Sequence, residues 1–519
     1  MTTPTPLLAP LSDVNNAPVL VVGAGIMGAG IAQVAALAGH PVMLFDVRDG
    51  AADQAREQLA ATFGTLVTKG KLSADTAALA LARIVAIASL EAASGAHLVV
   101  EAIVEKLDAK RSLFRQLEGV VSADCVLATN TSSISVTAIA NGLHHPQRLV
   151  GMHFFNPVPL MKLVEVVSGL QTSPAVANAI FELSKAWGKV PVHAKSTPGF
   201  IVNRIARPYY AETLALLQEQ ASTPAVLDAC LRAAGFRMGP CELMDLIGHD
   251  TNFSVTQSVY EANFFDKRFV PSLVQRELVD GGLLGRKSGR GFYTYDKGQP
   301  TAVGTASLTG DVSATAAGPE SAPALTGQVA VVGSGPVADR WAQALTAAGH
   351  AFERDTAADW TGLRVNGQQE LRLTDGRTAT QLGADVAVFD LPLATAPGAA
   401  LAFAVSLRAS PAWADAAAQW LQVLGFAPQR LADAPGLVVA RTIAMLINEA
   451  ADAVQQGVCS AEGADAAMKL GVNYPAGPFE WLARWDTAAV VALLDALDAH
   501  CRGERYRASP WLRQRAVGA

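Results

Sequence analysis

One histidine and one glutamate lie on two neighbouring strand-like runs and could perform acid–base chemistry together. In the stretch "GMHFFNPVPLMKLVEVV", His153 ends the first apolar run and Glu165 lies within the second. A neutral imidazole can take a proton from a hydroxyl group near pH 7, and a carboxylate can hold the ring and stabilise the imidazolium. Alone, such a histidine is more often a core residue and such a glutamate a solvated one. A catalytic role for the pair is therefore indicated only if other motifs of the chain support it.

A glycine-rich loop lies upstream of this pair. Gly23, Gly25 and Gly28 form a GxGxxG pattern between a strand-like run and a helix-length segment. The first glycine allows a tight turn, the second lets the backbone approach a pyrophosphate, and the third permits close packing of helix and strand. Asp46 ends the next strand-like run, "VMLFD", where a carboxylate accepts hydrogen bonds from the adenosine ribose. The loop therefore predicts NAD, and Arg48 nearby leaves NADP open.

Alternating strand-like and helix-length segments must position these residues. The alternation extends from Val19 to about Val192 and predicts a parallel sheet covered by helices. After Pro198 long helical patterns predict a separate all-α domain, and a Gly/Ser/Thr/Ala/Pro-rich run beyond it predicts a flexible linker. The expected segments are a disordered lead-in at 1–16, an NAD-binding Rossmann domain at 17–193, a helical domain at 194–296, a linker at 297–327, a degenerate Rossmann-like segment at 328–430 and a second helical domain at 431–519.

The degenerate segment is expected because the chain repeats itself. The stretch "VVGSGPVADRWAQALTAAGH" echoes "VVGAGIMGAGIAQVAALAGH", and "PGLVVAR" echoes "PGFIVNR". The second copy keeps Gly333 and Gly335 but has Ala338 at the third glycine position, and Ala440 replaces Asn203. Nothing in it corresponds to "NTSS" or "HFFNP", so no counterpart of the histidine–glutamate pair is expected. We predict one dinucleotide site in the chain.

Composition excludes several classes of protein. The 519 residues are 50% hydrophobic and 17% charged, with a net charge of −6, which gives no footprint for nucleic acid or an anionic membrane. The five cysteines are scattered, so neither a metal site nor a disulfide framework is indicated, and a reducing cytoplasm is expected. The start of the chain lacks the features of a signal peptide. The uncharged stretch 391–407 is short and contains two prolines, which favours a strand and a helix of a soluble domain over a membrane span.

Together with "ATNTSSIS" and "STPGFIVNRI", these motifs resemble the 3-hydroxyacyl-CoA dehydrogenase family, from about Val19 to Tyr295 and again from Pro435 onward. The chain is most similar to the long tandem branch of phenylacetate degradation, whose members oxidise 3-hydroxyadipyl-CoA. The resemblance implies a Rossmann-like α/β domain, an all-α C-terminal domain like that of 6-phosphogluconate dehydrogenase, and degenerate second copies of both. It also implies an acyl-CoA substrate, NAD as cofactor, no metal, and either a homodimer or a monomer whose two halves pair.

The resemblance assigns roles to individual residues. It implies His153 as general base, Glu165 as its partner, and Ser132 and Asn203 as hydrogen-bonding groups for the substrate. As alternatives, Ser132 could cap a helix and Asn203 could tie helices together. The implied cofactor contacts are Gly23, Ala24, Gly25, Ile26, Met27, Gly28, Asp46, Glu105, Lys110, Ser132, Asn156 and Lys287, and the implied contacts to the CoA substrate are Thr62, Lys69 and Ser132.

Two other readings of the function stay open. A related dehydrogenase on the same fold could act on 3-hydroxybutyryl-CoA or on a free sugar acid. A non-catalytic binding or structural protein could also keep this fold, as lens proteins of the superfamily do. The intact set of His153, Glu165, Ser132 and Asn203 argues against the second reading, because drift would erode such residues first.

Overall fold

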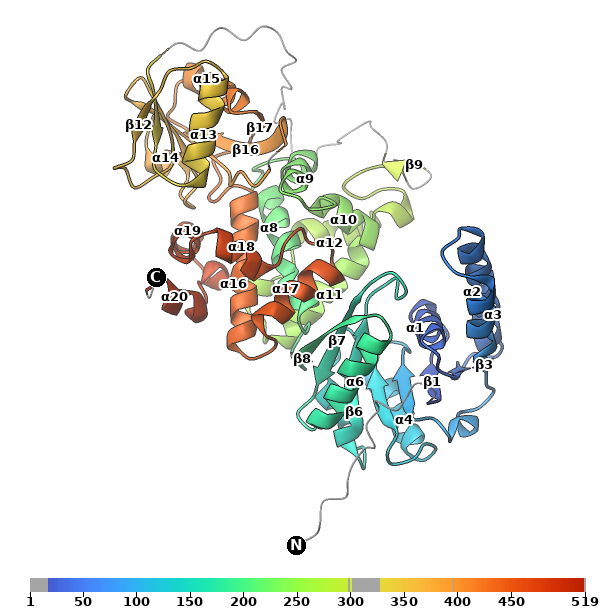
Figure 1. The fold of residues 1–519 in the computed structure, drawn as a ribbon. Helices are drawn as coiled ribbons and strands as arrows, with labels where there is room; N and C mark the ends of the chain where they lie inside the picture. Colours follow the sequence, from blue (N-terminus) through green and yellow to red (C-terminus); the bar gives the residue numbers. More distant parts are fainter. Residues whose placement is uncertain (1–16, 297–298, 301–326, 395, 518–519) are drawn as a thin grey trace. The chain divides into compact units, whose positions relative to one another are not determined.

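The structure is a computed structural model that describes residues 17–296, 299–300, 327–394 and 396–517 (Figure 1). These residues form two compact units. Unit 1 consists of residues 17–204 and 453–472, and unit 2 consists of the described residues of 205–452 and 473–517. The predicted lead-in and most of the predicted linker lie outside the described residues.

Unit 1 is built around an eight-stranded sheet with the order β3-β2-β1-β4-β5-β6-β7-β8. Neighbouring strands are parallel except at one junction, where β7 pairs antiparallel with β6. The expected parallel sheet is therefore present, with this one reversal near its edge. The strands are β1 (Val19–Val22), β2 (Val42–Phe45), β3 (Ile84–Ala86), β4 (Leu98–Glu101), β5 (Val126–Thr129), β6 (Leu149–Phe154), β7 (Leu163–Ser168) and β8 (Val190–Lys195).

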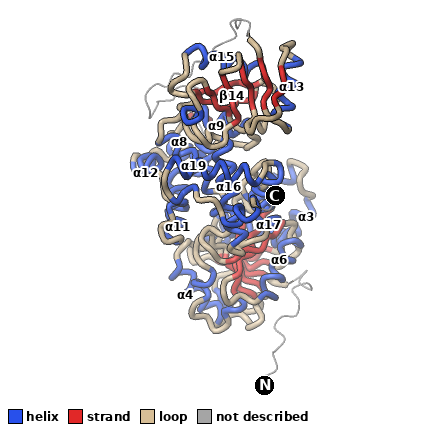
Figure 2. Tube along the Cα trace, turned by 90° about the vertical axis from the view of Figure 1, so that its left-hand side faces the viewer, coloured by secondary structure: helices blue, strands red, loops and turns tan. Residues whose placement is uncertain are grey.

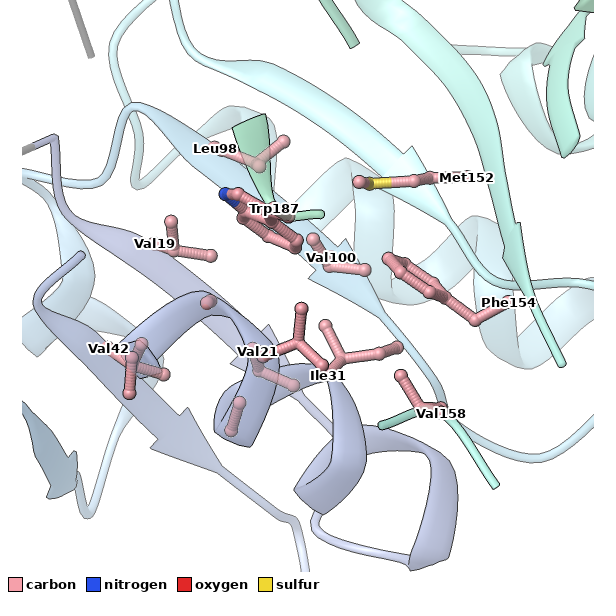
Figure 3. Packing of buried hydrophobic residues seen from close by; sticks show 14 of the residues in the cluster. Val19, Val21, Ile31, Val42, Leu98, Val100, Met152, Phe154, Val158 and Trp187 are labelled. Atoms are coloured by element: carbon pink, nitrogen blue, oxygen red, sulfur yellow. The ribbon is translucent and has the colours of Figure 1, made fainter. Parts of the chain in front are cut away.

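Helices of unit 1 pack on this sheet through a continuous apolar core. Ile31, Val100 and Phe154 lie close together in it, and Trp187 contributes its ring from the end of a helix (Figure 3). All four side chains are at most 6% exposed. The helices are α1 (Ile26–Leu37), α2 (Ala51–Thr68), α3 (Ala74–Ala82), η2 (Leu90–Ala93), α4 (Leu107–Glu118), α5 (Val136–Ala140), η3 (Pro146–Arg148), α6 (Pro174–Ala186), α7 (Val202–Ile205), which ends across the boundary with unit 2, and α17 (Ala461–Gly471).

Helix α17 belongs to unit 1 although it comes from the far end of the chain. It lies against β7 and β8, and a side chain at Gly471 would collide with Leu163 and Val202. The second helical segment therefore contributes part of the packing around the first sheet.

Unit 2 contains the remaining helices and a second sheet. Its helical elements are α8 (Arg207–Gln218), α9 (Pro224–Ala233), α10 (Pro240–Ile247), α11 (His249–Ala262), η4 (Lys267–Phe269), α12 (Leu273–Asp280), η5 (Arg286–Ser288), α16 (Val439–Gln455), of which 439–452 belong to this unit, α18 (Pro478–Arg484), α19 (Thr487–Cys501), η6 (Glu504–Tyr506) and α20 (Pro510–Ala516). A short hairpin joins β9 (Tyr295–Asp296) to β10 (Gln299–Pro300). In the described part of the chain, no helix is long and apolar enough to cross a membrane.

The second sheet is mixed, and its seven strands follow the order β12-β11-β13-β14-β15-β16-β17. Figure 2 draws its strands in red around the label β14. The loop of the second glycine motif connects β11 to α13, but an antiparallel hairpin, β13–β14, follows β12. The elements are β11 (Val329–Val332), α13 (Pro336–Ala347), β12 (Glu353–Asp355), β13 (Gly362–Val365), β14 (Gln369–Leu373), α14 (Ala379–Leu382), β15 (Val386–Phe389), β16 (Ala399–Val405), α15 (Pro411–Val423) and β17 (Phe426–Arg430).

The stretch 391–407 contains strand β16, as expected, but no helix among its described residues, so that part of the expectation is wrong. Its prolines, glycine and small residues precede a largely buried strand that lies between β15 and the edge strand β17. An apolar run buried between two neighbouring strands cannot be told from a helix by hydropathy alone.

Equivalent residues of the two copies, 237 positions apart, make the same contact in each unit. In unit 1, Arg204 donates to Gln456, and in unit 2, Arg441 donates to Glu219. Arg441 corresponds to Arg204, and Gln456 corresponds to Glu219. The second helical segment therefore contacts the first through residues that correspond between the two copies.

Arg441 is the centre of a buried ion cluster in unit 2. It is fully buried, and it donates through Nε to Glu212, at 2.7 Å, and through Nη1 and Nη2 to Glu219. Arg505 also pairs with Glu212, and the Tyr506 hydroxyl bonds to both Arg441 and Glu212. The cluster joins α8 to α16 and η6.

Replacing Arg441 by methionine should therefore destabilise the chain strongly. Removing one partner of a buried ion pair leaves a carboxylate uncompensated and costs about 3–5 kcal/mol. The matched control is Arg513→Met, because Arg513 pairs with Asp495 at the surface, where a pair contributes about 0–1 kcal/mol. Urea unfolding measures both, and similar midpoints for the two variants would contradict a central role for the cluster.

Candidate active site

The register of the first sheet places His153 and Glu165 side by side. They are directly opposite each other in the antiparallel pair of β6 and β7. The imidazole Nδ1 lies 2.6 Å from Glu165 Oε2, and the two residues are 5% and 0% exposed. Because the carboxylate is an acceptor, Nδ1 donates this hydrogen bond, which leaves Nε2 as the unprotonated nitrogen of the neutral ring.

Glu165 also holds the start of the helix that carries Asn203. Its second oxygen, Oε1, accepts hydrogen bonds from the backbone N–H groups of Ile201 and Val202, at 3.0 and 2.9 Å. One buried carboxylate thus orients the imidazole and caps the first turn of α7. A carboxylate at this end of a helix is also favoured by the helix dipole.

Two phenylalanine rings enclose the imidazole. The ring centroids of Phe155 and Phe200 lie 4.6 and 5.8 Å from that of His153. No described residue donates to or accepts from Nε2, which is the nitrogen available to a substrate hydroxyl. The aromatic contacts and the bond to Glu165 hold the ring in one orientation.

Phe200 has a left-handed backbone, with φ of 47°. Such a conformation is uncommon for a residue other than glycine. Leu437, its equivalent in the second copy, has φ of 52°, although no histidine accompanies it there. The conformation therefore belongs to the turn before the helix rather than to the chemistry.

Ser132 lies at the carboxyl end of β5, where Glu105 fixes the loop. Glu105 Oε1 accepts from the backbone N–H and hydroxyl of Ser132, at 2.8 and 3.3 Å, and from the Thr131 hydroxyl, at 2.7 Å. Burial alone would raise the pKa of Glu105, but the Lys110 ammonium and these hydrogen bonds lower the pKa to about 2. Glu105 is therefore ionised across the working range of pH.

Lys110 is buried rather than exposed to a ligand. It is 1% exposed, and its ammonium lies between the carboxylates of Glu101, at 2.6 Å, and Glu105, at 3.2 Å. Lys110 therefore helps to hold the carboxylate of Glu105, and its contact with the cofactor stays a prediction.

The structure brings two of the predicted substrate groups together. Asn203 Nδ2 lies 3.5 Å from the backbone oxygen of Ser132, and both residues are half-buried. Asn156, which follows β6, is exposed. Sequence reasoning missed Asn130, whose Oδ1 accepts from the backbone N–H of Phe154, at 2.8 Å, and so ties β5 to the end of β6. The signal for it was its place beside Ser132 in "ATNTSSIS".

The first glycine loop has the conformation that a dinucleotide requires. Gly23 has φ of 103°, and a side chain at Gly28 would collide with the Gly23 carbonyl oxygen. A side chain at Gly25 would meet nothing within 4 Å, and α1 begins there without a capping side chain. The open cradle and the uncapped N–H groups of α1 fit a pyrophosphate.

Asp46 is fixed beside this loop. It accepts from the backbone N–H of Ala24, at 2.8 Å, and Arg48 donates to both of its oxygens. The hydrogen bonds from Arg48, aided by that from Ala24, lower the pKa of Asp46 to about 2 in spite of its partial burial. The carboxylate is thus ionised at the end of β2, in the place expected for a ribose acceptor.

Large apolar side chains are exposed around the loop. Ile26, Val47 and Val104 are 79%, 84% and 63% exposed, and they follow the carboxyl ends of β1, β2 and β4. Ile26 was among the predicted contacts, whereas Val47 and Val104 were not. Exposed apolar groups at this edge of a parallel sheet suit the flat rings of a dinucleotide.

The other predicted contacts lie elsewhere. Thr62 and Lys69 are exposed on α2 and at its end, and the Thr62 hydroxyl donates to the Gln58 carbonyl. They are seven residues apart, so they lie on one face of the helix. Lys287 belongs to unit 2, where it pairs with Asp250 on α11.

In the second copy, other residues occupy the positions of the pair. The pairing of β15 with β16 and of β16 with β17 matches that of β6 with β7 and of β7 with β8. Asp390 takes the position of His153, and Ala402 takes that of Glu165. Asp390 accepts from three backbone N–H groups at the start of α16, those of Val438, Val439 and Ala440. The second copy keeps the capping carboxylate without a base.

The second glycine loop also differs from the first. Ala338 is fully buried where the first loop has Gly28, and Gly335 has φ of 91°, whereas Gly25 has φ of −72°. Pro336 begins the helix and has no N–H to offer a phosphate. A side chain at Gly335 would also meet nothing within 4 Å, so the second loop differs from the first in its backbone, in Ala338 and in the missing N–H of Pro336 rather than in open space.

Comparison with protein families gives matches along nearly the whole chain. Residues 18–197 match the family described as 3-hydroxyacyl-CoA dehydrogenase, NAD binding domain. Residues 199–295 and 436–517 match the 3-hydroxyacyl-CoA dehydrogenase C-terminal domain. Residues 371–435 match the 3-hydroxybutyryl-CoA dehydrogenase reduced Rossmann-fold domain.

Individual relatives show the same pattern. A 3-hydroxyadipyl-CoA dehydrogenase of Escherichia coli K12 is 42% identical over 97% of this chain and 98% of its own length. A probable 3-hydroxybutyryl-CoA dehydrogenase of Deinococcus radiodurans is 41% identical over 53% of this chain and 99% of its own length. The crystal structure of a 3-hydroxybutyryl-CoA dehydrogenase from Escherichia coli K12 covers 96% of this chain and 98% of its own, with a TM-score of 0.82 and 42% identity.

The geometry of the pair predicts that His153 and Glu165 act as one unit. His153→Gln should lower turnover by roughly 10²–10⁴-fold, because it removes the base. In Glu165→Gln the amide N–H₂ would face Nδ1 and favour the other tautomer, so turnover should fall by a similar factor. The double variant should be little worse than either single variant. Nicotinamide absorbance at saturating substrate measures all three.

Glu182→Gln is the control, because Glu182 lies exposed on α6 and pairs only with Lys185 among the described residues. Its turnover should equal that of the parent. Losses that multiply in the double variant would show that the two side chains act independently.

The two glycine loops predict one dinucleotide per chain. Gly25→Val should abolish NAD binding while the protein stays folded, because the added side chain enters the open cradle and touches no protein atom. Ser334→Trp, a bulky change at the exposed position between the two glycines of the second loop, should leave binding unchanged. Isothermal titration calorimetry counts the sites, and a stoichiometry of two would overturn this assignment.

Proposed function

The chain belongs to the 3-hydroxyacyl-CoA dehydrogenase family, and from this premise we propose that it oxidises 3-hydroxyadipyl-CoA to the 3-oxoacyl-CoA. It is an NAD-dependent enzyme acting on 3-hydroxyacyl-CoA. The observation that carries the choice of acyl group is the similarity to the 3-hydroxyadipyl-CoA dehydrogenase over almost the full length of both chains. A place in phenylacetate degradation follows from the same similarity.

In the proposed mechanism, His153 Nε2 takes the proton of the substrate hydroxyl. Glu165 keeps the proton of the ring on Nδ1 through its hydrogen bond and stabilises the imidazolium. Bound NAD would supply the acceptor for the hydride that leaves C3. Ser132 and Asn203 offer polar groups beside each other to hold the substrate near the base.

We further propose that the first glycine loop, Asp46 and the loop fixed by Glu105 hold the cofactor, and that Thr62 and Lys69 contact the CoA phosphates. The support for the first is the open cradle at Gly25 and the ionised carboxylate at Asp46. The support for the second is that Lys69 is exposed and lies two helical turns from Thr62.

We also infer that the chain pairs its own helical halves, as a monomer or within a larger assembly. The support is the buried cluster of Arg441 with Glu212, which seals α16 against α8. We place the enzyme in the cytoplasm because all five cysteines are free.

A second candidate substrate is 3-hydroxybutyryl-CoA, which is favoured by the name of the similar solved structure and by that of the Deinococcus relative. 3-Hydroxyadipyl-CoA carries a –CH₂–COO⁻ group on C4, where 3-hydroxybutyryl-CoA has a hydrogen. The rates with the two thioesters therefore distinguish the candidates.

The proposal predicts a preference of at least tenfold in kcat/KM for 3-hydroxyadipyl-CoA over 3-hydroxybutyryl-CoA. Binding a charged acyl terminus through one charge-assisted hydrogen bond contributes about 1.5–3 kcal/mol, which is roughly a 10–150-fold effect. Initial rates of nicotinamide reduction with each thioester measure the ratio. An equal or reversed preference would contradict the choice of acyl group and leave the reaction class intact.

A further inference from the structure

Unit 2 contains a pocket with a buried arginine that has no carboxylate partner. The pocket is open, with about 450 Å³ including the solvent at its mouth, and it lies among α8, α11, the start of α12 and Arg505. Arg207 lines it and is 5% exposed. Within the described residues, no carboxylate lies within salt-bridge distance of Arg207, whereas the buried Arg441 and Arg268 each pair with glutamate.

The hydrogen bonds of Arg207 leave most of its donors unused. Nη1 donates to the Thr256 hydroxyl, at 3.0 Å, and the guanidinium lies 5.0 Å from the centre of the Tyr210 ring. Nε is buried without an acceptor, and Nη2 donates to no described residue. A buried charge without a partner costs several kcal/mol, so an anion in the pocket would relieve that cost.

The rest of the pocket also favours a negative charge. Its lining contains no aspartate or glutamate. Ser272, which caps α12, lines it, so the positive end of that helix dipole faces it, and the first turn of α12 has no acidic residue. Arg505, the other charged group in the lining, is neutralised by Glu212. Arg207 is thus the cation that would hold an anion.

Apolar side chains complete the lining and indicate the kind of anion. Leu214, Val270 and Pro271 form part of the wall. Methylene groups pack against such side chains, whereas a free phosphate would gain nothing from them. The pocket suits a carboxylate at the end of a short aliphatic chain.

Arg207 occurs only in the copy that carries the chemistry. Its equivalent in the second copy is Ala444, just as Ala440 replaces Asn203. Arg207 follows Asn203 by four residues in the chain. The arginine is thus absent from the copy that lacks the catalytic residues, as expected of a group that serves a ligand of the enzyme.

We propose that this pocket binds an aliphatic carboxylate through Arg207. The ligand is a free aliphatic dicarboxylate, for which adipate is the probe. This proposal does not rest on the proposed function.

The test uses the full chain and two variants. Arg207→Met removes the charge and keeps the length of the side chain. Arg276→Met is the matched control, because Arg276 lies exposed on α12, outside the lining, and pairs with Asp280. For each protein, binding of free adipate is measured by calorimetry.

The parent and Arg276→Met should bind adipate, whereas Arg207→Met should bind it at least about tenfold more weakly, because it lacks the charge-assisted hydrogen bond. No adipate binding to the parent, or equal binding to the parent and to Arg207→Met, overturns the proposal.

A parent enzyme that prefers 3-hydroxybutyryl-CoA would count against the proposed substrate alone, since the adipate titration still decides whether the pocket binds a carboxylate. Arg207→Lys covers the case in which Arg207→Met fails to fold. Lysine keeps the charge but loses the fork of donors, so carboxylate binding should weaken without being lost.

Discussion

The buried carboxylate of Glu165 is the constraint on which the active site depends. One of its oxygens holds the imidazole of His153, and the other caps the helix that begins at Val202. Because a fully buried carboxylate must satisfy its acceptors within the protein, both contacts are obligatory. The base and the helix carrying Asn203 are therefore positioned by the same group. A change that moves one moves the other.

The second copy shows which part of this arrangement the fold needs. It keeps a buried carboxylate, Asp390, that caps the equivalent helix, but the carboxylate comes from the neighbouring strand, and Ala402 occupies the position of Glu165. The second copy thus has a carboxylate that caps the helix but no histidine that could act as a base. Capping is thus a demand of the architecture, whereas the bond from the carboxylate to an imidazole is specific to the catalytic copy.

Much of this could be predicted from the sequence, because the motifs are local. The strand around Val21, the glycine loop and the strands carrying His153 and Glu165 are where the patterns placed them. The hairpin of β13 and β14 in the second sheet was missed, although its strands are adjacent in the sequence and Asn366-Gly367, a typical hairpin turn, joins them. Asp390 was missed because only the strand register reveals that it occupies the position of a histidine. The burial of Lys110 and the unpaired state of Arg207 are properties of packing, which residue types alone do not specify.

The central claim is that Glu165 fixes His153 with Nδ1 protonated and Nε2 free to act as the base. The most direct measurement is nitrogen-15 NMR of the protein labelled at histidine, with the His153 signals assigned by their loss in His153→Gln. The account predicts the chemical shifts and couplings of the Nδ1–H tautomer for this residue. Signals of the Nε2–H tautomer would contradict it, because Nε2 could not then accept a proton from the substrate.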